Sequence, residues 1–197
     1  MNDSPPSNEP RQRLIEAAIA QIEATGLAGA TVRNISTRAG MNIASVNYYF
    51  GSKDALLDAA LVGSIEHMVS DASQILDGRP EIGLEATLVE LFVYLLEGAS
   101  RYPRLMRAHL EPAFAREDYS GPFPVLFDRI IIRLRDEVLL ARLTLEEDSA
   151  SRRVIAALSA ILFPSLFGGL FGSLDALQVG GSRAAYAERV ARSLLQA

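Results

Sequence analysis

A short segment of the chain, MNIASVNYYFGSK at residues 41–53, brings hydrogen-bonding, aromatic and basic side chains close together. Ser45 and Asn47 can exchange hydrogen bonds with base edges, and the Tyr48 ring can lie on thymine methyl groups or on sugars. Tyr49 and Lys53 can reach phosphate groups. These residue types predict a noncovalent chemistry, the binding of double-stranded DNA, provided that one element presents them on a common face.

Apolar spacing predicts that this element is a helix. Val46 and Phe50 lie four residues apart, so they share one face of a helix and can pack on a core. The positions that then point away from the core, at about 100° per residue, are Ala44, Ser45 and Tyr48, with Asn47 and Tyr49 on the flanks. Small residues at 44 and 45 let such a helix enter a major groove deeply. The same wheel places Ile43 on the inner side.

Capping residues predict how this helix is held. A helix over residues 32–39 ends at Gly40, and the link AGMN has the length of the turn in a helix-turn-helix. A long helix then begins at Lys53. The expected N-caps of these three helices are Thr31, Asn42 and Ser52. Arg33, in the first turn of the preceding helix, can reach a guanine or the DNA backbone.

The charge distribution agrees with DNA binding although the net charge does not. The chain carries a formal charge of −5, with 24 acidic residues among 197. From Ala24 to Lys53, however, there is no Asp or Glu, and Lys53 is the only lysine. Because local charge decides what a face can bind, this stretch can approach phosphates.

Helical spacing continues through the rest of the chain. Further helices are expected at 84–100, 103–116, 122–143, 149–176 and 182–196, with loops at 116–124 and 144–149. No half-buried sheet pattern of period two is evident. The sequence therefore predicts an all-α protein of about nine helices.

The stretch TVRNISTRAGMNIASVNYYFGSKDALLDAAL resembles the DNA-binding signature of tetracycline-repressor-type (TetR family) regulators, and the resemblance covers residues 11–60. It implies an N-terminal helix-turn-helix domain at 1–52, with a flexible tail at 1–9, and an effector-binding and dimerisation domain at 53–197. The implied DNA-contacting residues are Arg33, Asn42, Ala44, Ser45, Asn47, Tyr48, Tyr49 and Lys53. Ile43 occupies another position that can face DNA in the family, so its orientation stays open.

Residues 154–174 carry no charge over 21 positions, a length that could span a membrane. Pro164 and several glycines and serines interrupt the stretch, which favours a helix buried on nearly every side. Gly168 and Gly172 would allow close approach of a second helix. The resemblance implies that helices 149–176 and 182–196 form a four-helix bundle with a second subunit. The expected dimer interface is Leu166, Gly168, Gly172, Tyr186, Val190 and Leu194.

The same resemblance implies that the fourth to seventh helices form the sensor. Their candidate side chains are largely apolar and include methionine. The candidate effector-binding residues are His67, Met68, Leu91, Leu95, His109, Phe127 and Ile131. The alternative is that these residues are plain core, with each histidine satisfied by one hydrogen bond. An effector bound there is expected to be small and largely apolar.

The sequence lacks the residue patterns that several kinds of chemistry require. There is no cysteine, no metal-ligand spacing, no nucleophile elbow and no phosphate-binding glycine loop, so we expect no enzyme, metal site or cofactor. The N-terminus lacks the layout of a signal peptide, which favours the cytoplasm. The sequence predicts a homodimeric repressor released from a palindromic operator by its effector. The alternative is a helical small-molecule-binding or membrane-associated protein without DNA-binding function.

Overall fold

Short polar side chains begin the N-terminal helices in the structure, a computed structural model that describes residues 9–171 and 180–196. Thr31 Oγ1 accepts a hydrogen bond from the Asn34 amide at 3.2 Å at the start of α2 (Val32–Ala39). Asn42 Oδ1 accepts from the Ala44 amide at 2.9 Å, where α3 (Ala44–Phe50) begins. The Thr31 cap and Gly40 as the left-handed end of α2 are thus confirmed, whereas Asn42 caps the first amide of α3 from one residue before the N-cap position, which is Ile43.

The helix α4 (Lys53–Asp77) begins in the same way, because Ser52 Oγ accepts from the Ala55 amide at 3.1 Å. This helix belongs to both of the compact units into which the chain divides. Unit 1 comprises Met1–Glu66 and Arg104–Phe123, and unit 2 comprises His67–Pro103 and Pro124–Ala197. Compactness reports packing and not binding, so the functional boundary predicted between residues 52 and 53 stays a prediction.

Unit 1 is built from α1 (Glu9–Gly29), α2, α3, the first part of α4 and α7 (Pro103–Arg116). Their apolar faces meet in one core. Its most deeply buried members are Leu14, Ala18, Ile22, Ala30, Ile35, Val46, Leu56 and Ala60, and α7 adds Leu105 and Ala108. A helix from the second half of the chain therefore completes the core under the helix-turn-helix.

A reciprocal set of hydrogen bonds joins the end of α1 to the start of α7. Gly26 breaks the helical geometry of α1 with φ 76° and ψ 170°. Glu23 Oε2 accepts from the amides of Arg104 and Leu105, each at 3.0 Å. Arg104 Nη1 in turn donates to the carbonyls of Glu23 at 3.1 Å and Ala24 at 2.5 Å. Two amides in the first turn of α7, which have no partner within their own helix, are thereby satisfied.

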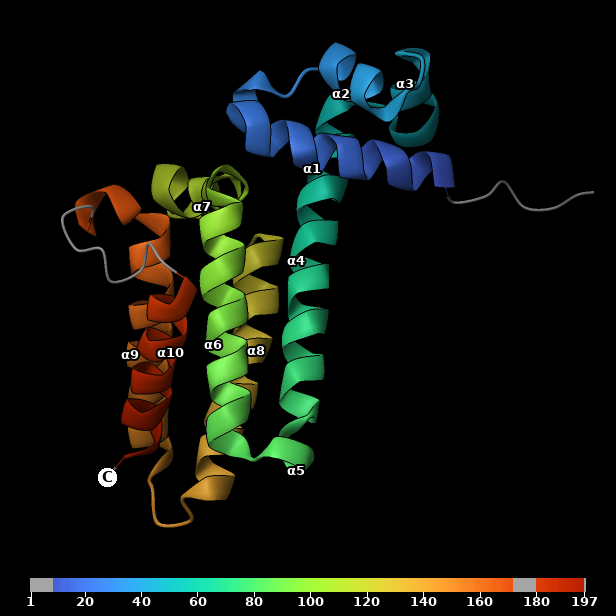
Figure 1. Cartoon of the computed structure of the whole chain (residues 1–197). Helices are drawn as coiled ribbons and strands as arrows, with labels where there is room; N and C mark the ends of the chain where they lie inside the picture. Colours follow the sequence, from blue (N-terminus) through green and yellow to red (C-terminus); the bar gives the residue numbers. More distant parts are fainter. Residues whose placement is uncertain (1–8, 172–179, 197) are drawn as a thin grey trace, which may run out of the picture. The chain divides into compact units, whose positions relative to one another are not determined.

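Unit 2 is a helical bundle in which α6 (Leu84–Arg101) lies beside α9 (Glu147–Leu166) and α10 (Gly180–Leu195) (Figure 1). It also contains α5 (Arg79–Ile82), α8 (Pro122–Ala141) and a 3-10 helix, η1 (Gly168–Phe171). Its core includes Leu88, Leu91, Phe92, Leu96, Ile130, Leu134, Val154 and Ile161. The apolar faces of α6, α8, α9, α10 and the second part of α4 thus converge on one cluster.

The all-α prediction is confirmed, with ten α-helices, one 3-10 helix and no strand over residues 9–171 and 180–196. The helix expected at 149–176 was too long, because α9 ends at Leu166 and a 3-10 turn follows; residues 172–176 lie outside the described part. Gly168 and Gly169 favour the break. The short helix α5, just before the helix expected at 84–100, was not predicted.

Within the described residues, no helix is long and apolar enough to cross a membrane. The uncharged stretch from residue 154 illustrates the reason. Its helical part ends at Leu166, and Val154, Leu158 and Ile161 are buried in the core of unit 2.

Candidate functional site

The outer face of α3 presents the predicted DNA-contacting side chains to solvent. Tyr48 is 82% exposed, and Ala44 and Asn47 are also exposed, whereas Val46 on the opposite side is fully buried. Ser45 is half-buried at the edge of this face. Tyr49 is half-buried and packs edge to face against Tyr48, with 4.8 Å between the ring centroids and planes at 90°. Tyr49 therefore orients the Tyr48 ring.

Ile43 also lies on the outer side, which the helical wheel did not predict. It is 49% exposed and has helical geometry, with φ −52° and ψ −38°, immediately before α3. Met41, earlier in the turn, is half-buried and packs on the core of unit 1, which also contains Ile35 and Val46. Because Met41 fills that inner place, Ile43 is left on the side of Asn47, one helical turn later.

The remaining predicted DNA-contacting residues differ in their exposure and in whether their polar groups already form hydrogen bonds. Arg33 is exposed on the first turn of α2, and Lys53 is half-buried at the start of α4. Asn42 is exposed, but its Oδ1 atom caps α3. The Asn42 side chain therefore both fixes the helix start and keeps its amide group as a donor for a phosphate.

Two arginines of unit 1 contact the ends of α2 and α3 but were not among the residues singled out from the sequence. The Arg11 guanidinium lies 4.9 Å from the centroid of the Phe50 ring, and Arg13 Nη2 donates to the Ala39 carbonyl at 2.8 Å. Both residues lie on the first turns of α1, and they hold that helix against the ends of α3 and α2. Their position ahead of the acid-free stretch was visible in the sequence, but their partners are more than 20 residues away.

Five of the seven predicted effector contacts gather in the apolar cluster of unit 2. Leu91 and Leu95 are buried there, and Met68, Phe127 and Ile131 pack against them. His67 does not join them, because its side chain is 79% exposed and its Nε2 atom lies 3.5 Å from Asp71 Oδ2. The five apolar residues are thus placed together on α4, α6 and α8.

His109 belongs to unit 1, where it is 9% exposed. Its Nε2 atom lies 3.0 Å from Ser64 Oγ, and its ring stacks at 5.6 Å on Phe123. Ser64 Oγ donates to the Leu61 carbonyl, so the imidazole N–H is the donor in the pair. Burial lowers the pKa of His109 to about 4, so the ring is neutral at pH 7.

Polar side chains around the unit 2 cluster are paired with one another. Tyr94 donates to Asp71 Oδ2 at 2.9 Å, and burial and this carboxylate raise the Tyr94 pKa. Glu137 is buried and accepts from Arg133 Nε at 3.0 Å, while Arg133 Nη2 donates to Asp77. An effector entering this cluster would therefore meet an apolar lining with paired polar groups at its margin.

The predicted interface residues of α10 face their own unit. Val190 is 9% and Leu194 is 3% exposed in the single chain, and Tyr186 donates to the Ala160 carbonyl at 2.8 Å. An amphipathic helix buries its apolar stripe on the nearest core, which here is that of unit 2. Leu166 is half-buried, Gly168 is exposed in η1, and Gly172 lies outside the described residues.

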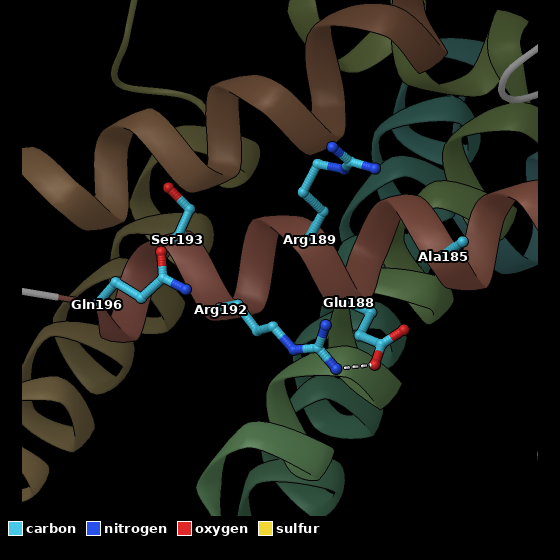
Figure 2. A pocket seen from close by; sticks show the side chains of 6 residues that line it. All are labelled: Ala185, Glu188, Arg189, Arg192, Ser193 and Gln196. Atoms are coloured by element: carbon cyan, nitrogen blue, oxygen red, sulfur yellow. Dashed lines mark hydrogen bonds and ion pairs between the residues drawn. The ribbon is translucent and has the colours of Figure 1, made fainter.

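The exposed surfaces of α9 and α10 are formed by residues other than the predicted interface residues of α10. On α9, Ile155 is 57% and Phe163 is 48% exposed, eight residues apart on one face. A shallow hollow follows α10, and Figure 2 shows the side chains that line it, Ala185, Glu188, Arg189, Arg192, Ser193 and Gln196. Arg192 is paired with Glu188 and, at 3.0 Å, with Glu85 of α6. The apolar outer face of this helix pair is therefore on α9.

A second hollow lies where α5 and α6 meet α10, lined by residues 82–86, Val89, Ala184, Ala185 and Glu188. None of the predicted effector contacts lines either hollow. Across the described part of the chain, no group of three His, Cys, Asp or Glu side chains is placed to hold a metal ion.

The capped α2, its tight glycine turn and the exposed face of α3 define a helix-turn-helix protein. Residues 14–60 match the family described as bacterial regulatory proteins, tetR family. This match covers 47 of the 197 residues, so the chain is similar to the family over its N-terminal region.

Sequence relatives match about a third of the chain. The regulator BetI of Paraburkholderia phytofirmans is 39% identical over 69 residues, which are 35% of this chain and 33% of BetI. The nicotine-responsive repressor HdnoR of Paenarthrobacter nicotinovorans is 33% identical over 72 residues, 36% of this chain and 37% of HdnoR. The matches thus span about a third of these curated relatives.

Solved structures match nearly the whole chain in fold. A tetR-family regulator from Mesorhizobium loti has a TM-score of 0.73 at 17% identity, covering 98% of both chains. A transcriptional regulator from Rhodococcus has a TM-score of 0.70 at 22% identity, covering 94% of this chain and 96% of its own. These matches show that the all-α fold of the chain is shared with solved structures.

Proposed function

We propose that this protein is a homodimeric transcriptional repressor, released from a palindromic operator by a small, largely apolar effector. The observation that carries the proposal is the outer face of α3. It combines an 82% exposed tyrosine, an exposed asparagine and small neighbours on a capped helix, within a stretch that contains no carboxylate. A core helix needs none of these features on its solvent side.

Two copies are needed for specific binding. One α3 helix contacts a single half-site, whereas two helices about 34–36 Å apart fit successive major grooves and gain both half-sites. The exposed apolar residues Ile155 and Phe163 of α9 offer a surface that a second copy would cover. Operator recognition is thereby tied to a surface outside unit 1.

The apolar cluster of unit 2 supports the effector proposal. Met68, Leu91 and Phe127 belong to it, and α4 continues from unit 1 into this cluster as a single helix. A ligand that separates the apolar side chains here would change the course of α4. By linkage, an effector that weakens operator binding is itself bound more weakly when operator is present.

A gel shift with the DNA upstream of the protein's own gene tests DNA binding. We expect a complex that survives competition by unrelated DNA and weakens steeply as salt is raised, because phosphate contacts release counterions. The matched control is unrelated DNA of equal length and base composition. Equal affinity for both DNAs at every salt concentration would refute sequence-specific regulation.

Titration of the protein–DNA complex tests the effector. Candidate compounds are malachite green and stearoyl-CoA, which are bound in solved structures of similar fold, together with inorganic phosphate and Mg²⁺ as polar controls. We expect an apolar compound to release DNA and the two ions to have no specific effect. Release by Mg²⁺ or phosphate at constant ionic strength would contradict an apolar effector.

A further inference from the structure

Two residues at the start of the outer face of α3 are apolar, so their side chains cannot form hydrogen bonds with DNA. Ile43 is 49% exposed and Ala44 is exposed, and neither side chain has a polar atom. Asn47 lies four residues after Ile43 and is exposed beside it. In this part of the surface, a large apolar side chain thus stands next to an amide.

The position of Ile43 is fixed by the helix start. Asn42 Oδ1 holds the Ala44 amide at 2.9 Å, and the Ser45 amide donates to the Asn42 carbonyl at 2.9 Å. The backbone on both sides of Ile43 is therefore tied into one turn. A β-branched side chain on such a backbone has few rotamers, so its methyl groups point in a defined direction.

Base edges in the major groove offer one apolar feature, the C5-methyl group of thymine. Guanine, cytosine and adenine present only donors and acceptors there, and the Ile43 side chain can satisfy none of them. Asn47 is suited to the N6 and N7 atoms of adenine. Four residues of helix rise about 6 Å, which is roughly one to two base steps of about 3.4 Å.

We infer that Ile43 is a specificity-determining residue that contacts a thymine methyl group in each half-site, with Asn47 on an adenine one or two base pairs away. The inference rests on the proposed function, because it assumes that α3 enters the major groove. It adds the identity of two bases that the operator must contain. Ala44 leaves the room that lets Ile43 approach the methyl group.

The test starts from a site selected by the wild-type protein from a random duplex library. Each thymine of one half-site is then replaced by uracil, which lacks only the methyl group. We expect one position at which wild-type affinity falls about fourfold, the effect of about 0.8 kcal/mol for one buried methyl-sized group. Ile43→Ala should bind the thymine site more weakly and be indifferent to uracil at that position.

A matched control is Ile82→Ala, because Ile82 is 51% exposed but lies on α5 in unit 2. This variant should keep both the affinity and the uracil effect, and thermal melting should show all three proteins folded. Uracil tolerated at every position by wild type, or the same sensitivity in Ile43→Ala, would overturn the inference while operator binding stands. If wild type selects no sequence at all, the proposed function itself fails, and the inference with it.

Discussion

Asn47 and Tyr48 stand exposed on α3 without a role in the core of unit 1. We therefore expect Asn47→Ala and Tyr48→Ala to weaken operator binding by about 1–3 kcal/mol each, the usual value of one good base contact. The melting temperature should stay within the range of surface substitutions. Fluorescence titration of labelled operator and thermal melting measure the two effects separately.

Tyr119→Ala is the matched control, because Tyr119 is 66% exposed in unit 1 but lies outside α3. It should leave operator affinity unchanged. Wild-type affinity in both α3 variants would show that this face does not contact DNA.

His109 makes the stability of the protein depend on pH. Burial lowers its pKa in the folded state to about 4, below the ordinary value of about 6.5. As the pH falls between these values, the unfolded chain takes up a proton that the folded chain refuses, so the free energy of unfolding decreases. The full loss from this group is up to about 3 kcal/mol.

Urea unfolding at pH 7 and pH 4.5 measures this effect in wild type and in His109→Gln. The variant keeps a side-chain N–H that can donate to Ser64 but has no proton to gain. Its unfolding free energy should fall less between the two pH values. Equal pH dependence in both proteins would assign the titration to other groups.

Residues governed by local spacing were predictable from the sequence, and residues governed by partners far along the chain were not. Thr31, Asn42 and Ser52 cap helices because their hydroxyl or amide oxygens lie two or three residues before the amides they bind. The side chain of Ile43 depends on which apolar residue of the turn fills the core. The contact of Arg11 with Phe50 needs the fold itself.

At the scale of elements, the hydrogen bonds between Glu23 and Arg104 join α1 to α7. Glu23 provides the cap that α7 lacks within its own sequence, because Tyr102, which precedes the first residue Pro103, is not a capping residue type. Loss of such a cap costs about 0.5–2 kcal/mol. We expect Glu23→Ala to lower the free energy of unfolding by that amount, measured by urea titration.

Glu16→Ala is the control for this prediction, since Glu16 is an exposed residue of α1 that accepts a hydrogen bond from the nearby Gln12. It should change stability by less than about 0.5 kcal/mol. If Arg104→Ala and Glu23→Ala have additive effects in the double variant, the reciprocal bonds do not act together.

Element boundaries were predictable where a cap or glycine marks them. Helix α2 ends before Gly40, α3 ends before Gly51, and α4 begins after Ser52. The end of α9 was placed ten residues late, because apolar composition continues past Leu166 although Gly168 and Gly169 no longer favour an α-helix. The four residues of α5 are too few to show a helical period.

At the scale of the whole molecule, assembly should depend on the exposed apolar face of α9. We expect Ile155→Glu to yield monomers and to abolish specific operator binding, because a buried unpaired carboxylate in the interface is costly. Since Ile155 is 57% exposed in the single chain, the monomer should stay folded. Sedimentation, circular dichroism and operator titration give the three readouts.

Leu143→Glu is the matched control, because Leu143 is 88% exposed and lies in the loop between α8 and α9. It should leave mass and affinity unchanged. A stable dimer of Ile155→Glu would exclude this face. Among the described residues, a Cβ at Gly168 would meet no atom of its own chain within 4 Å, so Gly168→Leu should leave the monomer folded and tests the predicted contact of Gly168 separately.

The core of unit 1 draws on two distant parts of the chain, and this has a consequence for protein engineering. Leu105 and Ala108 complete the packing under the helix-turn-helix, and Arg104 binds the end of α1. A chimera that transplants residues 1–66 alone onto the body of another regulator would leave this core open. To move the DNA specificity of this protein as a working module, the graft must also carry residues 104–123.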